Sequence, residues 1–190
     1  ITIAARDYRP RYVALTEEHQ ARLRQPETAH DGRRLLAVLR TESPKPAPGL
    51  LLPPVAATGS GFGEPRTYPG AAGVESRIDA LQGERHRGLD YAVPIGTPVR
   101  TPAAGTVLFA GPLTLSGETV VIDHGQGVLS VLQHLSRVDT RTGDPVAAGS
   151  GKSNATRCRD AAAATGRIFS SALMRLCACF ALVALARNLS

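Results

Sequence analysis

The chain has 190 residues, of which 43% are hydrophobic and 20% charged, so it is neither disordered throughout nor fibrous and has room for one ordinary domain with appendages. Aromatic residues reach only 4%, which argues against base stacking on single-stranded nucleic acid. Residues 1–150 hold 16 Lys and Arg against 15 Asp and Glu, whereas residues 151–190 hold six against one, so the net charge of +6 belongs to the tail. We therefore expect no nucleic-acid partner.

Residues 1–42 are predicted to form a helical lead-in without chemistry of its own. Thr16 can cap a helix over residues 16–40, and Gln25-Pro26-Glu27 should break this helix into two pieces. Residues 43–57 form a predicted linker, because five prolines within twelve residues favour an extended chain. The chain begins at Ile1 without a basic and apolar leader, so we expect a processed form or a fragment.

Residues 58–150 are predicted to be a β domain, because short apolar runs alternate with Gly and Pro and no helix-length period is present. Val120 and Ile122 should face one side of a strand, and Val121 and Asp123 the other. A small antiparallel sandwich or rolled sheet is the expected outcome, with a long loop over Glu64–Arg85. The expected strands are Thr97–Arg100, Gly105–Ala110, Glu118–Asp123, Gly127–His134 and Pro145–Ala148.

Residues 151–190 are predicted to be a divergent basic and apolar tail. Residues 168–186 form an almost unbroken apolar run, interrupted by Arg175, and are long enough for a membrane helix. One Arg near the middle of such a helix costs about 2.5 kcal/mol on insertion scales, so we favour a buried or disordered tail over membrane contact. All five His precede residue 135 and all three Cys follow residue 157, and a Cys-free body fits an envelope protein as well as a cytosolic one.

The segment His86-Arg87-Gly88-Leu89-Asp90 carries the candidate chemistry. On a straight strand, side chains four residues apart share a face but lie about 13 Å apart, too far for one metal ion. A bend at Gly88 would bring the His86 imidazole and the Asp90 carboxylate together. His124 ends a predicted strand, and we expect a structural role for it.

The segments around this pair resemble the lysostaphin-type zinc peptidases, bacterial enzymes that cut peptide bonds in peptidoglycan. The resemblance covers about residues 58–150 and is carried, in family order, by His86–Val99, Pro102–Val107, Thr119–Gly125, Gln133–Ser136 and Gly143–Gly149. It implies a small antiparallel β domain of the lysostaphin-like type (a duplicated hybrid motif) with a groove for an extended peptide. It also implies a zinc cofactor and a peptidoglycan peptide as substrate. The implied location is the bacterial cell envelope, periplasmic or extracellular.

The resemblance also assigns roles to three side chains. His86 and Asp90 would be zinc ligands, and His134 would be the catalytic residue beside the metal, where it positions or deprotonates water or stabilises the oxyanion. A catalytic zinc ion takes three protein ligands and keeps one position open for water. An imidazole that does not bind the metal can move protons nearby.

One part of the family pattern is missing, because the family completes its site with H-x-H and this chain has no His after His134. Three explanations stay open. In the first, the tail is foreign to the fold, through a shifted reading frame or a mis-joined segment. In the second, the domain is a degenerate, non-catalytic relative that binds cell wall or activates an amidase. In the third, Cys177-Ala178-Cys179-Phe180 replaces H-x-H-F, since thiolate is a zinc ligand. The expected function is therefore that of a zinc metalloendopeptidase of peptidoglycan, inactive if the third ligand is lacking.

Overall fold

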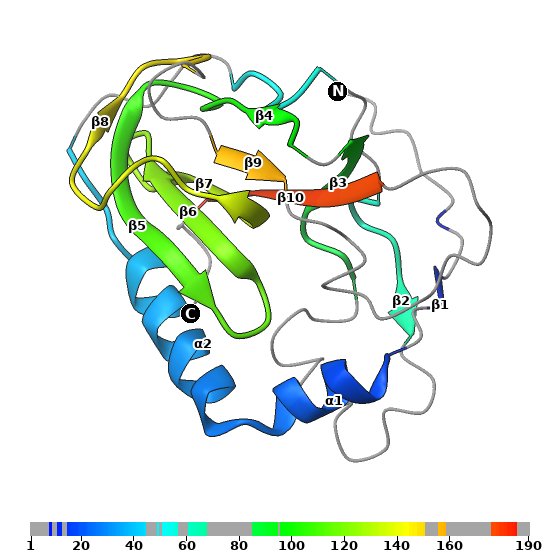
Figure 1. The fold of residues 1–190 in the computed structure, drawn as a ribbon. Coiled ribbons are helices and arrows are strands. Elements are labelled where there is room, and N and C mark those ends of the chain that lie inside the picture. Colours follow the sequence, from blue (N-terminus) through cyan, green and yellow to red (C-terminus); the bar gives the residue numbers. More distant parts are fainter. Residues whose placement is uncertain are drawn as a thin grey trace.

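The computed structural model of the chain describes residue 8 and residues 11–12, 15–44, 49, 51–56, 61–67, 85–94, 96–150, 156–158 and 176–185. Two helices, α1 (Glu17–Arg24) and α2 (Pro26–Leu39), lie beside a curled antiparallel sheet (Figure 1). The strands are β1 (Arg11–Tyr12), β2 (Arg66–Thr67), β3 (Leu89–Pro94), β4 (Pro98–Val99), β5 (Gly105–Leu113), β6 (Gly117–Asp123), β7 (Val128–Arg137), β8 (Pro145–Val146), β9 (Thr156–Cys158) and β10 (Leu176–Leu185). The expected mainly β fold is confirmed.

The sheet order is β3-β10-β7-β6-β5-β8, and every neighbouring pair is antiparallel. Strands β5, β6 and β7 form a meander, and the β6–β7 turn is tight because Gly125, Gln126 and Gly127 all have positive φ. Strand β9 pairs with both β4 and β7 and closes the curl of the sheet. The five strands expected from the sequence correspond to β4–β8, with shifted ends.

The two faces of the sheet bury separate apolar clusters, as the alternation in β6 predicts. Val120 and Ile122 belong to the cluster inside the curl, whereas Val121 belongs to the cluster on the outer face. The inner cluster also contains Val55, which is buried although it lies in the segment expected to be a linker. Backbone hydrogen bonds from Leu52 N to Pro102 O and from Arg100 N to Pro54 O attach this segment to the domain.

Helix α2 covers the outer cluster. The predicted break in the lead-in is confirmed, because Thr16 caps α1 with its side chain and Pro26 opens α2 immediately after Gln25. Leu35, Val38 and Leu39 of α2 pack against Phe109, Leu113, Val121 and Val131. A carboxylate oxygen of Asp31 accepts hydrogen bonds from the backbone N and the hydroxyl of Thr114, both at 2.7 Å.

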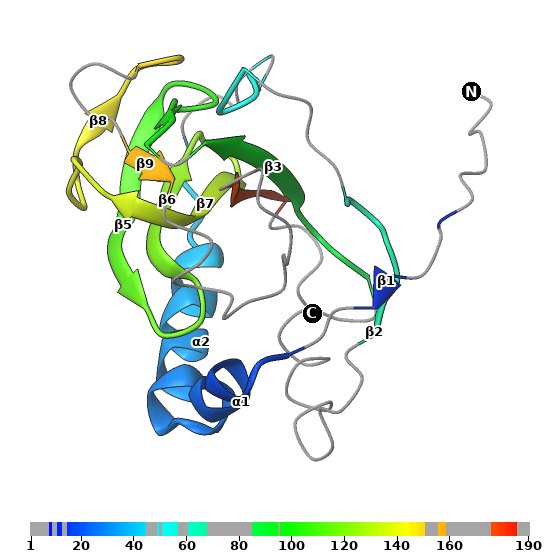
Figure 2. The same cartoon turned by 45° about the vertical axis from the view of Figure 1, so that its right-hand side comes forward.

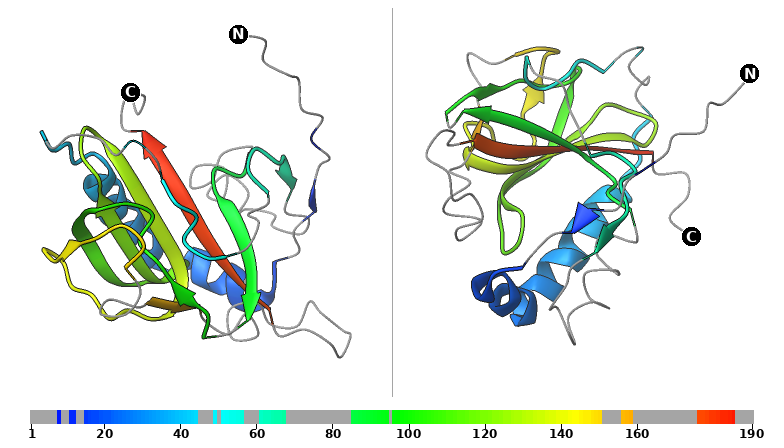
Figure 3. Two further views of the ribbon diagram at one scale, coloured as in Figure 1. Left: turned by 90° about the horizontal axis from the view of Figure 1, so that it is seen from above. Right: turned by 90° about the vertical axis from the view of Figure 1, so that its right-hand side faces the viewer.

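Strand β10 lies within residues 151–190, which were expected to be a divergent tail without regular structure. Residues 176–185 lie between β3 and β7, where Figure 3 shows them in red among the other strands. The apolar run over residues 168–186 is therefore a strand over its described part, and residues 168–175 and 186 lie outside the described residues. Among the described residues, no helix has the length and apolar character needed to cross a bilayer.

A second, small pair of strands lies beside the main sheet. Strand β1 pairs in parallel with β2, with Arg11 opposite Arg66, and Figure 2 shows this pair next to the chain that leads into β3. A β-bridge joins Pro65 to Arg85. Residues 61–67 are thus fixed alongside the segment that contains His86. Most of the loop expected over Glu64–Arg85 lies outside the described residues.

Candidate functional site

The His86 side chain is buried in a corner made by residues 61–66. The backbone N–H of His86 donates to Glu64 O at 2.9 Å, and the N–H of Gly63 donates to His86 O at 2.8 Å. Positive φ values at Gly61 and Gly63 turn the chain tightly there, as expected of turn residues. Backbone hydrogen bonds with residues 63 and 64 therefore hold the His86 main chain in place.

The structure brings His86 and Asp90 together. The chain bends at Gly88, β3 begins at Leu89, and the His86 Nε2 atom lies 3.4 Å from Asp90 Oδ1. This is the outcome expected from a glycine bend rather than from a straight strand. Two ligand atoms on a tetrahedral zinc ion, each with a bond of about 2.0–2.1 Å, lie about 3.3 Å apart, so the spacing fits a shared metal ion.

The hydrogen bond made by Nδ1 of His86 determines which ring nitrogen carries the proton. The Nδ1 atom lies 2.9 Å from Gly61 O, and because a carbonyl can only accept, Nδ1 carries the proton. The lone pair of Nε2 therefore faces Asp90 Oδ1. Burial lowers the pKa of His86, against the raising effect of the Asp90 carboxylate, and keeps the imidazole neutral as a metal ligand requires.

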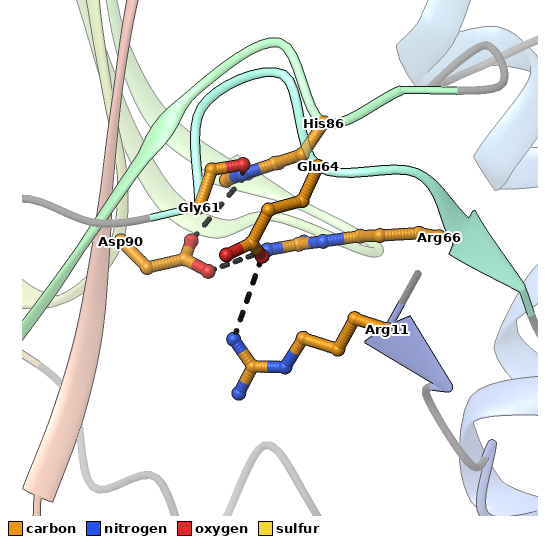
Figure 4. A network of polar contacts seen from close by, with 6 residues as sticks. All are labelled: Arg11, Gly61, Glu64, Arg66, His86 and Asp90. Carbon is orange, nitrogen blue, oxygen red and sulfur yellow. Dashed lines mark hydrogen bonds and ion pairs between the residues drawn. The ribbon is translucent and has the colours of Figure 1, made fainter. Parts of the chain in front are cut away.

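The second oxygen of Asp90 has a different partner. Arg66 Nη2 lies 2.5 Å from Asp90 Oδ2, and these side chains are only 9% and 16% exposed. Figure 4 shows the Arg66 guanidinium and the His86 imidazole approaching the carboxylate together. Farther out, Arg11 Nη1 lies 3.9 Å from Glu64 Oε2. Asp90 thus has one carboxylate oxygen next to Arg66 and the other next to His86.

His134 reaches the same face of the sheet through a β-bulge. Leu132 pairs with Val120 and Leu135 pairs with Glu118, so two residues of β7 oppose one residue of β6. Leu132 and Leu135 both enter the inner cluster, which leaves Gln133 and His134 on the outer face. The bulge residue His134 has a φ of 57° and donates its backbone N–H to Ser116 O at 2.8 Å.

The sheet register places this face beside Asp90. Phe180 of β10 pairs with Asp90 on one side and with Gln133 on the other. Tyr91 and Val93 of β3 face the inner cluster, so Asp90 between them faces outward like Gln133. With strands about 4.8 Å apart, the backbones of Asp90 and Gln133 lie about 9–10 Å apart. His134 follows Gln133 directly in the sequence.

In the part of the chain that the structure describes, no further His, Cys, Asp or Glu joins His86 and Asp90 to make a group of three that could hold a metal ion. Strand β10 carries the C-x-C motif, but its register sets Cys179 opposite Tyr91 and Cys177 opposite Val93. Phe180, not a cysteine, is the residue opposite Asp90. The register therefore gives no support to cysteine in place of H-x-H.

The model for peptidase family M23 matches residues 84–160, which contain His86, Asp90 and His134. A peptidoglycan DD-endopeptidase of Vibrio cholerae, ShyA, is 39% identical over 64 residues, which are 34% of this chain and 15% of the relative. The DD-carboxypeptidase/endopeptidase Mpg of Neisseria meningitidis is 42% identical over 59 residues, which are 31% of this chain and 14% of the relative. The matches thus span less than a sixth of these relatives.

Solved structures share the fold. A peptidase M23 from Pseudomonas aeruginosa superposes with a TM-score of 0.54 and 30% identity, covering 84% of this chain and 59% of the other. A zinc-containing peptidase from Vibrio cholerae gives a TM-score of 0.50 and 25% identity, covering 70% of this chain and 37% of the other. The similarity therefore extends beyond the residues that the family model matches.

Proposed function

We propose that this chain, whose residues 84–160 match the model for peptidase family M23, is a zinc metalloendopeptidase that cleaves peptide bonds in bacterial peptidoglycan. The main support for the proposal is the distance of 3.4 Å between two atoms that can each donate a lone pair to a metal ion, His86 Nε2 and Asp90 Oδ1. The names of two relatives, a peptidoglycan DD-endopeptidase and a DD-carboxypeptidase/endopeptidase, support the substrate class.

In this proposal His86 binds zinc through Nε2 and Asp90 binds it through Oδ1. When bound, the zinc ion supplies Lewis-acid polarisation of the substrate carbonyl and a water of lowered pKa. The Gly61 carbonyl keeps the His86 proton on Nδ1, so that Nε2 stays available. His134 would be the proton carrier, because it follows Gln133, which is in register with Asp90 across Phe180, and because it is half-buried rather than enclosed.

The location that fits this substrate is the bacterial cell envelope, periplasmic or extracellular. The relatives named for peptidoglycan support it, as does a lipoprotein NlpD/LppB homologue of Pseudomonas aeruginosa that is 37% identical over 71 residues. That match covers 37% of this chain and 24% of the lipoprotein homologue.

The zinc content of the purified full-length chain tests the metal site. We expect stoichiometric zinc in the wild type, and loss of zinc in both His86→Ala and Asp90→Ala. His30→Ala is the matched control, because His30 is exposed on α2 and should leave the zinc content unchanged. Zinc that persists in both site variants would contradict the proposal.

Digestion of purified peptidoglycan separates the enzyme from its alternative. An endopeptidase releases cleaved peptides, and His134→Ala should abolish this release while zinc is retained. The alternative, a degenerate relative that binds cell wall or activates an amidase, is favoured by the pairing of only two metal donors in the described part of the site. It predicts cell-wall association without released peptide, and that association should survive His134→Ala.

A further inference from the structure

We propose that Arg66 is a positioning residue that holds the Asp90 carboxylate in the one orientation that presents Oδ1 to a metal ion shared with His86. The inference rests on the proposed function, because it concerns the same metal pair. Arg66 itself would contact neither the metal nor the substrate. It would act through Asp90 alone.

The geometry of the Asp90 carboxylate supports this role. Arg66 Nη2 lies 2.5 Å from Asp90 Oδ2, while Asp90 Oδ1 lies 3.4 Å from His86 Nε2. The terminal torsion of an aspartate is soft, so a carboxylate without a partner on one oxygen samples a broad range of orientations. A charge-assisted hydrogen bond to one oxygen removes that freedom and fixes the direction of the other.

Burial of the Arg66 side chain supports the same role. The Arg66 side chain is 9% exposed, so its guanidinium has given up most of its water for this contact. An ion pair at this depth is a weak source of stability, since desolvation of both charges offsets their attraction. The ion pair beside His86 is therefore better explained by orientation of the Asp90 carboxylate than by folding energy.

Arg66 and the Gly61 backbone, which holds the His86 imidazole, form one structural unit. A Cβ atom at Gly61 would lie 3.0 Å from His86 Nδ1, 3.2 Å from Arg66 Nη2 and 3.3 Å from Asp90 Oδ2. The Gly61 backbone therefore lies where all three side chains meet. Its carbonyl directs the imidazole, and Arg66 directs the carboxylate.

The backbone also explains why Arg66 can serve as a fixed support. Arg66 is the first residue of β2, which pairs in parallel with β1. The carbonyl of the preceding Pro65 accepts a hydrogen bond from Arg11 N at 2.9 Å, and Pro65 also forms a β-bridge with Arg85. Segments on both sides thus hold the chain at Arg66. A side chain that starts from a braced backbone needs to order fewer torsions to reach Asp90.

The guanidinium charge has an opposite effect that the experiment must weigh. A positive charge close to Asp90 repels an incoming dication and competes with it for the carboxylate. If orientation dominates, removal of Arg66 weakens metal binding. If repulsion or competition dominates, removal of Arg66 strengthens it.

The affinity of the full-length chain for Co²⁺, measured by competition with a chromophoric chelator, distinguishes these effects. We expect Arg66→Gln to weaken Co²⁺ binding by about 10–100-fold, the usual effect of removing a group that orients a metal ligand. The intensity of the visible Co²⁺ absorption should change as well, because the Asp90 oxygen is no longer fixed. In an Asp90→Ala background, Arg66→Gln should have no further effect.

Two further variants complete the test. Arg137→Gln is the matched control, since Arg137 pairs with Asp139 at 2.6 Å but is 62% exposed, and its Co²⁺ affinity should equal that of the wild type. Arg66→Lys keeps the charge with a less directional donor, so its affinity should lie between those of the wild type and Arg66→Gln. If Arg66→Gln does not fold, an Arg66→Lys affinity below that of the wild type still supports the proposal.

The outcomes separate this inference from the proposed function. Equal or tighter Co²⁺ binding in Arg66→Gln, or in Arg66→Lys, would overturn the positioning role and leave the metal site standing. A further loss on adding Arg66→Gln to Asp90→Ala would show that Arg66 acts elsewhere and would also overturn it. A wild-type chain that binds neither Co²⁺ nor Zn²⁺ would overturn both proposals.

Discussion

His124 illustrates at the residue scale how burial selects one form of a titratable group. Its Nδ1 lies 2.9 Å from Ala104 O and therefore carries the proton, and its Nε2 accepts from the Ser130 hydroxyl at 2.8 Å. Of the two neutral tautomers, only this one satisfies both ring nitrogens. Burial lowers the pKa of His124, which agrees with the structural role expected from the sequence.

The lowered pKa of His124 makes the fold weaker in mild acid. The unfolded chain takes up the proton near pH 6.5, whereas the folded chain does so only at lower pH, so the unfolded state binds more protons below pH 6.5. Stability is therefore fully present above pH 6.5 and is lost as the pH falls towards the folded pKa. Urea unfolding at pH 7.5 and pH 5.5 should show a smaller pH difference in His124→Gln than in the wild type.

The same substitution should lower the free energy of unfolding at pH 7.5 by about 1–3 kcal/mol, because a buried hydrogen bond is lost. His86 also has a lowered pKa, but it is present in both proteins and cancels in the comparison. An identical pH dependence in the two proteins would show that His124 does not titrate differently on folding.

Single residues also show where sequence reasoning succeeds and where it stops. The His86–Asp90 pair could be predicted because both residues and the glycine that bends the chain lie within five positions. Gly61 and Arg66 could not, because they are 25 and 24 residues away from the groups they contact. Nothing in the local sequence pattern marks the Gly61 carbonyl as a hydrogen-bond partner for His86.

At the scale of elements, the bulge in β7 has the largest consequence for the site. Without the extra residue, strict alternation would put Leu132 and His134 on the same face, inside the inner cluster. The bulge returns Leu135 to that cluster and leaves His134 outside. The price is a left-handed φ of 57° at a residue with a side chain.

The strain at His134 predicts a difference between two substitutions. Glycine adopts positive φ freely, whereas a β-branched residue there is strongly disfavoured. His134→Val should therefore have a free energy of unfolding about 1–2 kcal/mol lower than His134→Gly, as urea denaturation would measure. Equal stabilities of the two variants would mean that the bulge is not maintained in solution.

Elements with a strong local signal were predicted well. The helix break at Pro26 and the strands β5 to β7 follow from proline chemistry and from alternation. Strand β10 was missed because its uniformly apolar sequence shows no period of two. A strand that lies between two others is recognised from its pairing partners, which are distant in the sequence. An apolar run of this kind is therefore equally consistent with a segment of a buried helix.

At the scale of the whole molecule, the lead-in helices are part of the domain rather than an appendage. Helix α2 covers the outer cluster, and Arg34 lies over the Phe109 ring at 4.7 Å. Asp31 fixes the start of the β5–β6 turn through both Thr114 hydrogen bonds. The expectation that residues 1–42 carry no chemistry stays a prediction, but their packing role is larger than the sequence indicates.

The contact between Asp31 and Thr114 gives a stability prediction for the docked helix. Asp31→Ala removes two hydrogen bonds to a charged acceptor and should lower the free energy of unfolding by about 1.5–3 kcal/mol. Arg33→Ala, at an exposed position on the same helix, should change it by no more than about 0.5 kcal/mol. Urea denaturation with equal losses in both variants would argue against this anchor.

The position of β10 has a consequence for the order in which the protein is made. Among the strands described, β3 forms its ladder with β10 alone. Translation runs from the N-terminus, so the ribosome releases His86 and Asp90 long before residues 176–185 become available to pair. The backbone that carries His86 and Asp90 therefore gains this neighbour only after β4 to β9 have been synthesised, and nascent chains should stay open to proteases at this edge until β10 emerges.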